Sequence, residues 1–377
     1  MRLLLDVSAV PTRPVGAGVY TLEIARELSH RAAVDLHLVT RRGDAERWSQ
    51  VAPSATLHPE VPESRPARLA WEQIGATKLA THVKADLWHG PHYTLPIRLR
   101  IPSVVTIHDL TFFEHPEWHE RSKVVFFRRM IRASIQRCAS IIAVSEHTGR
   151  RLQAVLSPTA PMYVAPHGVD HRRFVATSAD ATGADDLSRL AATGIHPPYL
   201  AFAATIEPRK DVPNLIRAFS LIAPDRPALR LVVAGRDGWG TEHVRDAAAQ
   251  SGCTTRILRV GWMADDVLPA FFRRAEAVAY PSLEEGFGLP ALEALACGAA
   301  LVTTTGSAME DVVGEAALLV PPCDTPALAV ALARVCDDPA VRTRLRAAGP
   351  ERARPFTWGA SVDQHLAAYA GALGGRA

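Results

Sequence analysis

Two glutamates eight residues apart flank a glycine-rich turn in the second half of the chain. The stretch Tyr280–Gly298 reads YPSLEEGFGLPALEALACG and contains Glu285 and Glu293. The turn that follows the first glutamate is formed by Gly286, Phe287, Gly288 and Leu289. Glycines let a ligand approach the backbone closely, and a helix N-terminus suits a phosphate or a polyhydroxylated ring. The stretch therefore indicates a phosphate or sugar site, although a lone G-x-G is more often an ordinary strand, turn and helix with a capping acid.

A second candidate for chemistry is a pair of adjacent cations at Arg209 and Lys210. They stand in the loop ATIEPRKDVPNLIRAF, next to the start of a helix at Pro213. A diphosphate requires such cations, which form charge-assisted hydrogen bonds with its oxygens. An Arg-Lys pair taken alone is as readily a solvated surface pair.

Two features of the first half could meet a ligand at the edge of a sheet. Gly16 and Gly18 precede a helix and form a phosphate-loop candidate, but Thr21 stands where a dinucleotide fingerprint requires a third glycine. His108 ends the apolar run SVVTIH, and ligands of parallel sheets gather at such carboxyl ends. A single histidine there is more often a structural core residue.

Strands that alternate with helices must position these residues. Apolar runs predict a first series of strands at 3–7, 34–39, 103–108 and 140–144, and VAPHGVD at 164–170 closes it. A second series is predicted at 200–204, 229–234, 256–260, 275–280, 300–303 and 317–320. Pro290 is expected at the first position of the helix after the glycine turn, which puts Glu293 in the first turn near the amides of Gly288 and Leu289.

Composition narrows the classes of protein. With 377 residues and 48% hydrophobic residues, the chain is large enough for two α/β domains with full cores. A net charge of +3 argues against nucleic acid as a partner. The five cysteines show no CxxC spacing, and we find neither an H-E-x-x-H motif nor a D-x-D pair, so we predict no metal site and no cofactor. The apolar run in the N-terminal MRLLLDVSAV is too short for a signal peptide, so we expect a cytoplasmic protein.

Taken together, the motifs resemble a known family. E-G-F-G-L-P-A-L-E, continued by A-L-A-C-G, resembles the E-x7-E motif of retaining GT-B-fold glycosyltransferases of the family 4 type, which include many mannosyltransferases. V-T-I-H-D-L with H-P-E-W, the E-P-R-K string and the loop AGRDGWG are similar to segments of the same family. Three places depart from it. Val19 replaces an arginine of the family's G-G-x-G-R-Y-like loop, Ala204-Thr205 replaces Gly-Arg, and TTTGSAMEDV at 303–312 replaces the usual S-N-x-S-S-L-P-E-V.

The resemblance implies a role for each candidate. Lys210 and Arg209 would hold the diphosphate, with Arg209 taking over from the missing second cation. Glu285 would hold donor-sugar hydroxyls or stabilise an oxocarbenium-like transition state, Glu293 would bind the ribose, and His108 would orient the sugar. These assignments make four residues catalytic, namely His108, Glu285, Arg209 and Lys210. The donor-binding residues would be Gly16, Gly18, Gly235, Glu285, Gly286, Phe287, Gly288, Leu289 and Glu293.

The resemblance also implies the domain organisation. The fold class would be α/β in the GT-B arrangement, with two Rossmann-like parallel-sheet domains facing each other across a cleft. We expect an acceptor-side domain at 1–172, a linker at 173–198 because this segment is polar, and a donor-binding domain at 199–355. The helix at about 356–377 would pack back on the first domain.

A basic amphipathic segment at 121–137 suggests a further partner. Arginines and a lysine alternate there with valines, phenylalanines and isoleucines, a pattern that suits the inner face of an anionic membrane. A domain helix with a solvated basic face explains the same pattern, and most such helices are of that kind.

The sequence thus predicts a metal-independent, retaining hexosyltransferase. GDP-mannose is the first choice of donor, and the acceptor would be a glycan, a lipid-linked sugar or a small molecule with a hydroxyl group. A UDP-sugar or dTDP-sugar dependent transferase is the nearest alternative. A sugar-nucleotide epimerase and a non-catalytic nucleotide-binding partner subunit are the others.

Overall fold

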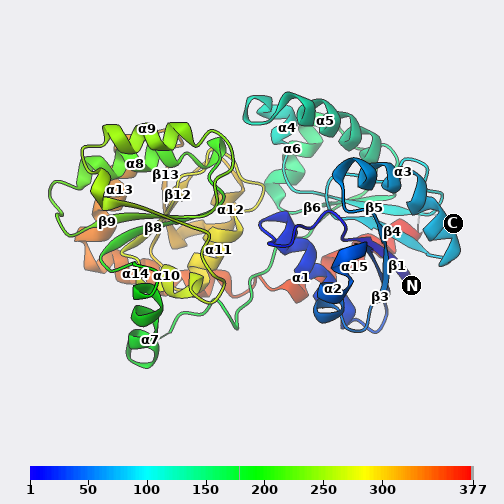
Figure 1. Cartoon of the computed structure of the whole chain (residues 1–377), viewed down its shortest axis with the longest axis horizontal. Helices are drawn as coiled ribbons and strands as arrows, with labels where there is room; N and C mark the ends of the chain where they lie inside the picture. Colours follow the sequence, from blue (N-terminus) through cyan, green and yellow to red (C-terminus); the bar gives the residue numbers. More distant parts are fainter. Residues whose placement is uncertain (178, 375–377) are drawn as a thin grey trace. The chain divides into compact units, whose positions relative to one another are not determined.

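The computed structural model describes residues 1–177 and 179–374 and divides into two compact units. Unit 1 comprises Met1–Gly168 together with the C-terminal segment from Trp358, and unit 2 comprises Val169–Thr357 (Figure 1). The predicted boundary at residue 172 therefore falls inside unit 2. The chain passes between the units after Gly168 and after Thr357. Val169 donates a backbone hydrogen bond to Phe356 O at 3.0 Å, so the two connecting segments are in contact there.

Unit 1 is built on a seven-stranded parallel sheet in the order β3-β2-β1-β4-β5-β6-β7. Its strands are β1 (Arg2–Asp6), β2 (Asp35–Arg41), β3 (Thr56–Val61), β4 (Leu87–Gly90), β5 (Ser103–Ile107), β6 (Ser140–Ala143) and β7 (Met162–Val164). Strands β1, β4, β5 and β6 are mostly apolar, as is usual where helices cover both faces of a parallel sheet. The strand order reverses between β1 and β4, which marks the place where sheets of this kind bind ligands.

The helices of unit 1 connect these strands. They are α1 (Ala17–Ser29), α2 (Ala45–Val51), α3 (Arg65–His82), α4 (Thr111–Glu114), α5 (Arg121–Ile135), α6 (Glu146–Leu156) and α15 (Trp358–Gly374), with short 3-10 turns η1 (Arg42–Asp44) and η2 (Pro116–Trp118). Helix α15 packs on α1 and on strands β4 to β7. The predicted C-terminal helix thus belongs to unit 1 by contact, and residues 375–377 lie outside the described residues.

Unit 2 repeats the architecture with six parallel strands in the order β10-β9-β8-β11-β12-β13. The strands are β8 (Tyr199–Ala203), β9 (Arg230–Ala234), β10 (Ile257–Gly261), β11 (Ala277–Tyr280), β12 (Leu301–Thr304) and β13 (Ala317–Val320). The helices are α7 (Ala179–Ala191), α8 (Val212–Ile222), α9 (Glu242–Gln250), α10 (Leu268–Arg274), α11 (Leu289–Ala296), α12 (Ala308–Val313), α13 (Thr325–Asp337) and α14 (Pro339–Ala353), with 3-10 turns η3 (Pro208–Lys210), η4 (Thr254–Arg256) and η5 (Gly314–Ala316). The reversal of strand order lies here between β8 and β11.

The segment at 173–198 is not a linker. It contains α7, which packs on α10 within unit 2. Asp186 is buried and accepts hydrogen bonds from Arg273 at 2.6 Å and from Arg274 at 3.1 Å. The prediction was wrong because it relied on the polar composition of the segment. The buried charge of Asp186 is paired with arginines far away in the sequence, and Leu190 and Ile195 are fully buried.

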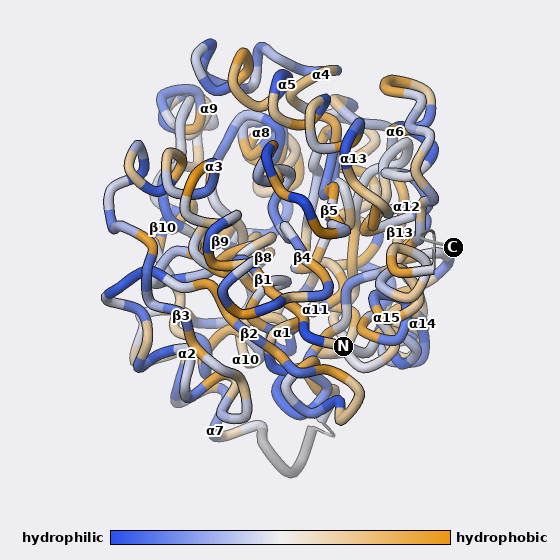
Figure 2. Tube along the Cα trace, turned by 90° about the vertical axis from the view of Figure 1, so that its right-hand side faces the viewer, coloured by the Kyte–Doolittle hydropathy of each residue, from blue (hydrophilic) through white to orange (hydrophobic). Residues whose placement is uncertain are grey.

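Hydropathy follows the layers of each unit. In Figure 2 apolar residues recur along the strands, whereas apolar and polar residues alternate along the helices. Strands β4, β5 and β11 are buried at every position. Within the described residues, no helix combines the length and the apolar character needed to cross a membrane.

Candidate active site

Three predicted residues of unit 2 meet in one buried ion-pair cluster. Strands β8 and β11 are neighbours, so the loops at their carboxyl ends lie together. Arg209 donates from Nη1 to Glu285 Oε2 at 2.8 Å, and Lys210 Nζ donates to Glu285 Oε1. Lys210 also donates to the Tyr280 hydroxyl at 2.8 Å. We call Arg209, Lys210 and Glu285 the cation–glutamate cluster.

The two cations of this cluster keep Glu285 ionised despite its burial. Burial opposes ionisation of Glu285, but Arg209 and Lys210 lower the pKa of its carboxyl to about 2. Burial and the neighbouring Arg209 lower the pKa of Lys210, while Glu285 acts in the opposite direction. Arg209 also pairs with Glu207 through Nε. Two cations are therefore held in place by two carboxylates, which a polyanionic ligand would have to replace.

The glycine turn brings Glu285 to this cluster. Gly288 adopts a left-handed conformation with φ of 96° as the N-cap of α11. A Cβ atom at this position would lie 2.1 Å from Met309 Sδ, so a larger residue does not fit. The structure therefore explains the glycine first by backbone geometry and packing against α12.

Glu293 does not lie where the sequence predicted it. Helix α11 begins at Leu289, so Pro290 occupies the second helical position and no acid stands in the first turn. The prediction was wrong because the left-handed Gly288 ends the turn one residue earlier than expected. Burial raises the pKa of Glu293 to about 8, with Arg173 lowering it and Asp265 raising it. Glu293 is accordingly protonated at neutral pH.

Gly235 has a packing role in the structure. Its φ is 133°, and a Cβ atom would lie 1.7 Å from Ala204 O, in the loop after β8. Its amide donates to Gly261 O at 2.6 Å. This glycine therefore lets the loops after β8, β9 and β10 approach one another beside the cation–glutamate cluster.

The remaining predicted residues lie in unit 1. Gly16 caps α1 with a φ of 48°, and Gly18 lies in the first turn of that helix against Pro14. His108 follows β5 and is buried, with Nε2 2.8 Å from Pro91 O. A carbonyl oxygen only accepts, so Nε2 carries the proton of the ring. Burial lowers the pKa of His108, which leaves it neutral near pH 7.

A buried hydrogen-bond network behind His108 was missed by the sequence prediction. The Tyr20 hydroxyl lies 2.8 Å from Thr106 Oγ1 and 2.6 Å from His365 Nε2. Thr106 in turn contacts His89 Nε2 at 2.8 Å, and His89 Nδ1 contacts the Tyr369 hydroxyl at 2.8 Å. The Tyr20 ring also meets the His108 ring edge-on at 5.0 Å.

This network ties the start of α1 and the end of β5 to α15. Two signals could have pointed to it: Thr106 is a polar residue in an otherwise apolar strand, and His365 and Tyr369 are four residues apart on one helix face. Their partners could not be identified, because they are up to 345 residues away in the chain.

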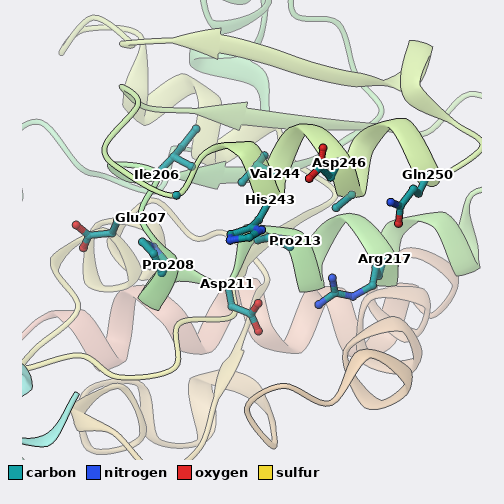
Figure 3. A pocket seen from close by; sticks show the side chains of 12 residues that line it. Ile206, Glu207, Pro208, Asp211, Pro213, Arg217, His243, Val244, Asp246 and Gln250 are labelled. Atoms are coloured by element: carbon teal, nitrogen blue, oxygen red, sulfur yellow. The ribbon is translucent and has the colours of Figure 1, made fainter. Parts of the chain in front are cut away.

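A separate pocket of unit 2 is lined by Glu207 and Pro208, from the loop that carries the two cations, but not by Arg209 or Lys210. It has a volume of about 390 Å³ and lies between η3, α8 and α9 (Figure 3). Its charged lining residues are Glu207, Asp211, Asp246 and Arg217, with His243 beside them. Three carboxylates against one arginine disfavour a diphosphate, so this pocket is not the place for the phosphates of a donor. Across residues 1–177 and 179–374, no group of three or more His, Cys, Asp or Glu is arranged to hold a metal ion.

Two doubly wound parallel sheets, with charged residues at the switch point of the second, define a two-unit α/β protein of the Rossmann-like kind. Residues 14–173 match the family model described as Glycosyltransferase Family 4. Residues 192–352 match the one described as Glycosyl transferases group 1. The chain belongs to the GT-B glycosyltransferases of the family 4 type.

Individual relatives agree with this family. The O-antigen chain mannosyltransferase B of Escherichia coli is 28% identical over 288 residues, which cover 76% of this chain and 74% of the relative. A D-inositol 3-phosphate glycosyltransferase of Salinispora tropica is 29% identical over 398 residues, which cover 95% and 81%.

Solved structures share the fold. Sucrose-phosphate synthase from Thermosynechococcus elongatus superposes with a TM-score of 0.79 at 20% identity, covering 98% of each chain. HepE of Anabaena in complex with UDP-glucose gives a TM-score of 0.76 at 16% identity, covering 97% of this chain and 99% of that one.

Proposed function

We propose that the chain transfers a hexose, with retention of configuration, from a nucleotide-diphosphate sugar to a hydroxyl group of an acceptor. The acceptor class is a glycan, a lipid-linked sugar or a small molecule. The observation that carries the proposal is the cation–glutamate cluster, in which two cations and a carboxylate meet at the switch point of the unit 2 sheet.

The chemistry follows from the charges of this cluster. A nucleoside diphosphate leaves only if its developing negative charge is neutralised, and Arg209 and Lys210 supply two positive charges in a buried setting. When the diphosphate binds the cations, their contacts with Glu285 and Glu207 loosen. In the cluster without a ligand the pKa of Glu285 is about 2, so its carboxylate is ionised and is placed to stabilise the positive charge that develops on the sugar. We assign no residue as a covalent nucleophile.

The other predicted residues complete the donor site in this proposal. Glu293 is protonated near pH 7, so its carboxyl can both donate to and accept from the ribose hydroxyls. His108 orients the sugar through its unprotonated Nδ1, because Pro91 O fixes the proton on Nε2. In this proposal the backbone of the turn at 286–289 and of the loop at Gly235 approaches the donor, and Gly16 and Gly18 are the donor-binding glycines assigned in unit 1.

GDP-mannose is the donor we favour. The V-T-I-H-D-L, E-P-R-K and E-G-F-G-L-P strings are most similar to mannosyltransferase-type members, and two relatives carry mannosyltransferase names. A UDP-sugar or dTDP-sugar is the alternative.

A thermal-shift panel of GDP, UDP, ADP and dTDP tests the donor, since a ligand that binds only the folded state raises the melting temperature. If GDP gives no shift at about millimolar concentration while another nucleotide does, the donor choice is wrong. Product analysis with GDP-mannose and no acceptor separates transfer from epimerisation, because only an epimerase yields an isomerised sugar.

We also propose a contact between α5 and the inner face of an anionic membrane, where a lipid-linked acceptor would be found. Val125 is 70% exposed on this helix, and Arg129 and Arg132 are exposed on the same side. Arg128 has a structural role instead, because it donates to Phe112 O and Phe113 O. Co-sedimentation with phosphatidylglycerol vesicles should exceed that with phosphatidylcholine vesicles and should fall in Arg129→Glu. Equal sedimentation in both would refute the contact.

A further inference from the structure

Lys210 has a second hydrogen-bond acceptor besides Glu285, and this acceptor belongs to the sheet of unit 2. Tyr280 is the last residue of β11 and is 1% exposed. Its hydroxyl lies 2.8 Å from Lys210 Nζ, which also donates to Glu285 Oε1. A lysine ammonium has only donors, so the tyrosine oxygen is the acceptor. Nζ lies 5.0 Å from the centroid of the ring, so the hydroxyl makes the close contact and the ring does not.

Packing fixes the place of this hydroxyl. The Tyr280 ring stacks on Phe202 of β8, with centroids 5.8 Å apart and planes at 16°. The Tyr280 carbonyl accepts from Thr303 Oγ1 of β12 at 2.8 Å, and the two residues are paired in the sheet. Neighbouring strands thus hold Tyr280 from both sides, whereas Glu285 lies in the turn between β11 and α11. Of the two acceptors of Lys210, Tyr280 is the one that the sheet itself holds in place.

The two acceptors also differ in charge. Burial, and next the charge of Glu285, raise the pKa of Tyr280 well above its ordinary value, so the phenol is neutral near pH 7. A neutral oxygen accepts a hydrogen bond from an ammonium without cancelling its charge. A diphosphate would compete with the carboxylate of Glu285 for Lys210 and would leave the contact with Tyr280 intact.

The surroundings of Lys210 show why this contact bears on its protonation. The charged and titratable groups near the contact are Glu207, Arg209, Glu285 and Glu293. Burial and the neighbouring Arg209 lower the pKa of Lys210, whereas the carboxylates of Glu285 and Glu207 raise it. Once a ligand displaces Glu285, the hydroxyl of Tyr280 remains as an acceptor for the ammonium. A hydrogen bond to the charged form of a group favours that form.

We propose that Tyr280 is a positioning residue of the transferase, whose hydroxyl holds the ammonium of Lys210 in place and charged when a nucleoside diphosphate displaces Glu285. The inference rests on the proposed function and adds to it a residue to which that function assigns no role. Tyr280 acts through Lys210, and no contact with the reacting atoms is assigned to it.

The protonation of Lys210 can be followed directly because lysines are few. The sequence contains four, of which Lys78, Lys84 and Lys123 are at least partly exposed and Lys210 is buried. We would label the full chain with isotope-labelled lysine and follow the ε-carbon signals by NMR between about pH 6 and about pH 11. The signal that is absent from Lys210→Met belongs to Lys210.

Tyr280→Phe removes the hydroxyl and keeps the ring. We expect the midpoint of the Lys210 titration to fall by at least about 0.5 pH unit, because the charged form loses an acceptor. Tyr199→Phe is the matched control, since Tyr199 is a fully buried tyrosine of the neighbouring β8 whose hydroxyl donates to Phe271 O at 2.8 Å. Both variants lose one buried hydroxyl, so a purely structural role would lower both melting temperatures and leave the Lys210 midpoint unchanged.

The decisive comparison uses Glu285→Gln as the background, because this change reproduces the loss of the carboxylate. Lys210 should titrate at lower pH there than in wild type, since Glu285 raises its pKa. Addition of Tyr280→Phe should lower the midpoint further, again by at least about 0.5 pH unit. A smaller difference in this background, or a shift of the same size in Tyr199→Phe, overturns the proposal.

Nucleotide binding connects the titration with the proposed function. Calorimetry would use whichever of GDP, UDP, ADP and dTDP binds wild type, at about pH 7 and about pH 9. Tyr280→Phe should weaken this nucleotide at least about 1.5-fold more at the higher pH, because more of Lys210 is then uncharged, and Tyr199→Phe should show no such difference. Equal weakening at both pH values would refute the effect of Tyr280 on the charge of Lys210. Failure of every nucleotide to bind wild type would count against the transferase proposal, while the Lys210 titration would still decide the role of Tyr280.

Discussion

Removal of Lys210 is the sharpest test of the cation–glutamate cluster. The residue is 5% exposed and donates both to Glu285 and to the Tyr280 hydroxyl. Lys210→Met keeps the length of the side chain and removes its charge. Of the two cations in the cluster, Arg209 then remains to pair with the buried Glu285.

The magnitude follows from the pKa of Glu285. A fall from 4.5 to about 2 corresponds to about 3 kcal/mol of stabilisation, shared between Arg209 and Lys210. Because this pKa is lowered in the folded state, the stabilisation is fully present above pH 4.5 and is lost as the pH falls towards 2. Loss of one member of a buried ion pair typically costs about 3 to 5 kcal/mol, so Lys210→Met should be clearly less stable than wild type at pH 7.

A double-mutant cycle with Glu285→Gln separates this stability effect from catalysis. Urea unfolding of wild type, both single variants and Lys210→Met/Glu285→Gln should show non-additive losses, with a coupling of at least about 1 kcal/mol. The exposed ion pair of Lys123 and Glu120, 2.8 Å apart, is the control. A cycle built on Lys123→Met should show little coupling between these two side chains. Additive losses in the cluster would mean that the two side chains do not interact as the structure has them.

Turnover measured under conditions where each variant is folded completes the test. One contact to a leaving phosphate contributes about 2 to 4 kcal/mol in the transition state, so the rate of Lys210→Met should fall by roughly 30-fold to 1,000-fold. A rate within about threefold of wild type would refute the role of Lys210 in neutralising the leaving group.

Four further predictions concern Glu293, Glu285, Gly288 and the cations of the cluster. The pKa of Glu293 is raised from 4.5 to about 8, so wild type should lose stability relative to Glu293→Gln as the pH rises through this range. Melting curves of both proteins at pH 4.5 and pH 8 measure this difference. An unchanged difference in melting temperature would show that the folded protein does not favour the protonated carboxyl. Glu293→Gln should also weaken bare GDP in calorimetry while Glu285→Gln mainly lowers turnover, and equal behaviour of the two variants in both assays would end this division of roles. Gly288→Ala should destabilise unit 2 by about 2 to 4 kcal/mol, because of its φ of 96° and the contact of a Cβ atom with Met309, and a melting temperature equal to that of wild type would contradict this geometry. Transfer should survive EDTA, since two cations meet the diphosphate; complete loss that magnesium restores would show that a metal does this work.

The alternation of strands and helices was readable in the sequence because both sheets are buried. Strands such as β5 and β11 are mostly apolar and fully buried, and the structure places them within one or two residues of their predicted bounds. The segment at 173–198 was misread because its charged residues find their partners outside the segment. Asp186 is satisfied by Arg273 and Arg274, and no local pattern reveals such an ion pair.

The candidate site was predicted in its residues but not in its contacts. Arg209, Lys210 and Glu285 stood out by type and by their places after apolar runs. That Glu285 pairs with both cations depends on the pairing of β8 with β11, across 75 residues of sequence.

The sequence by itself determined which residues could do chemistry and that each would lie where a strand ends. Periodicity and glycine spacing are local properties, and the chain carries them along its whole length. The tertiary structure alone decided which of these residues touch, which carboxyls are ionised and where polar atoms remain without partners. Those properties depend on burial and on neighbours distant in the chain, because Arg209 and Lys210 hold Glu285 charged whereas burial favours the neutral form of Glu293.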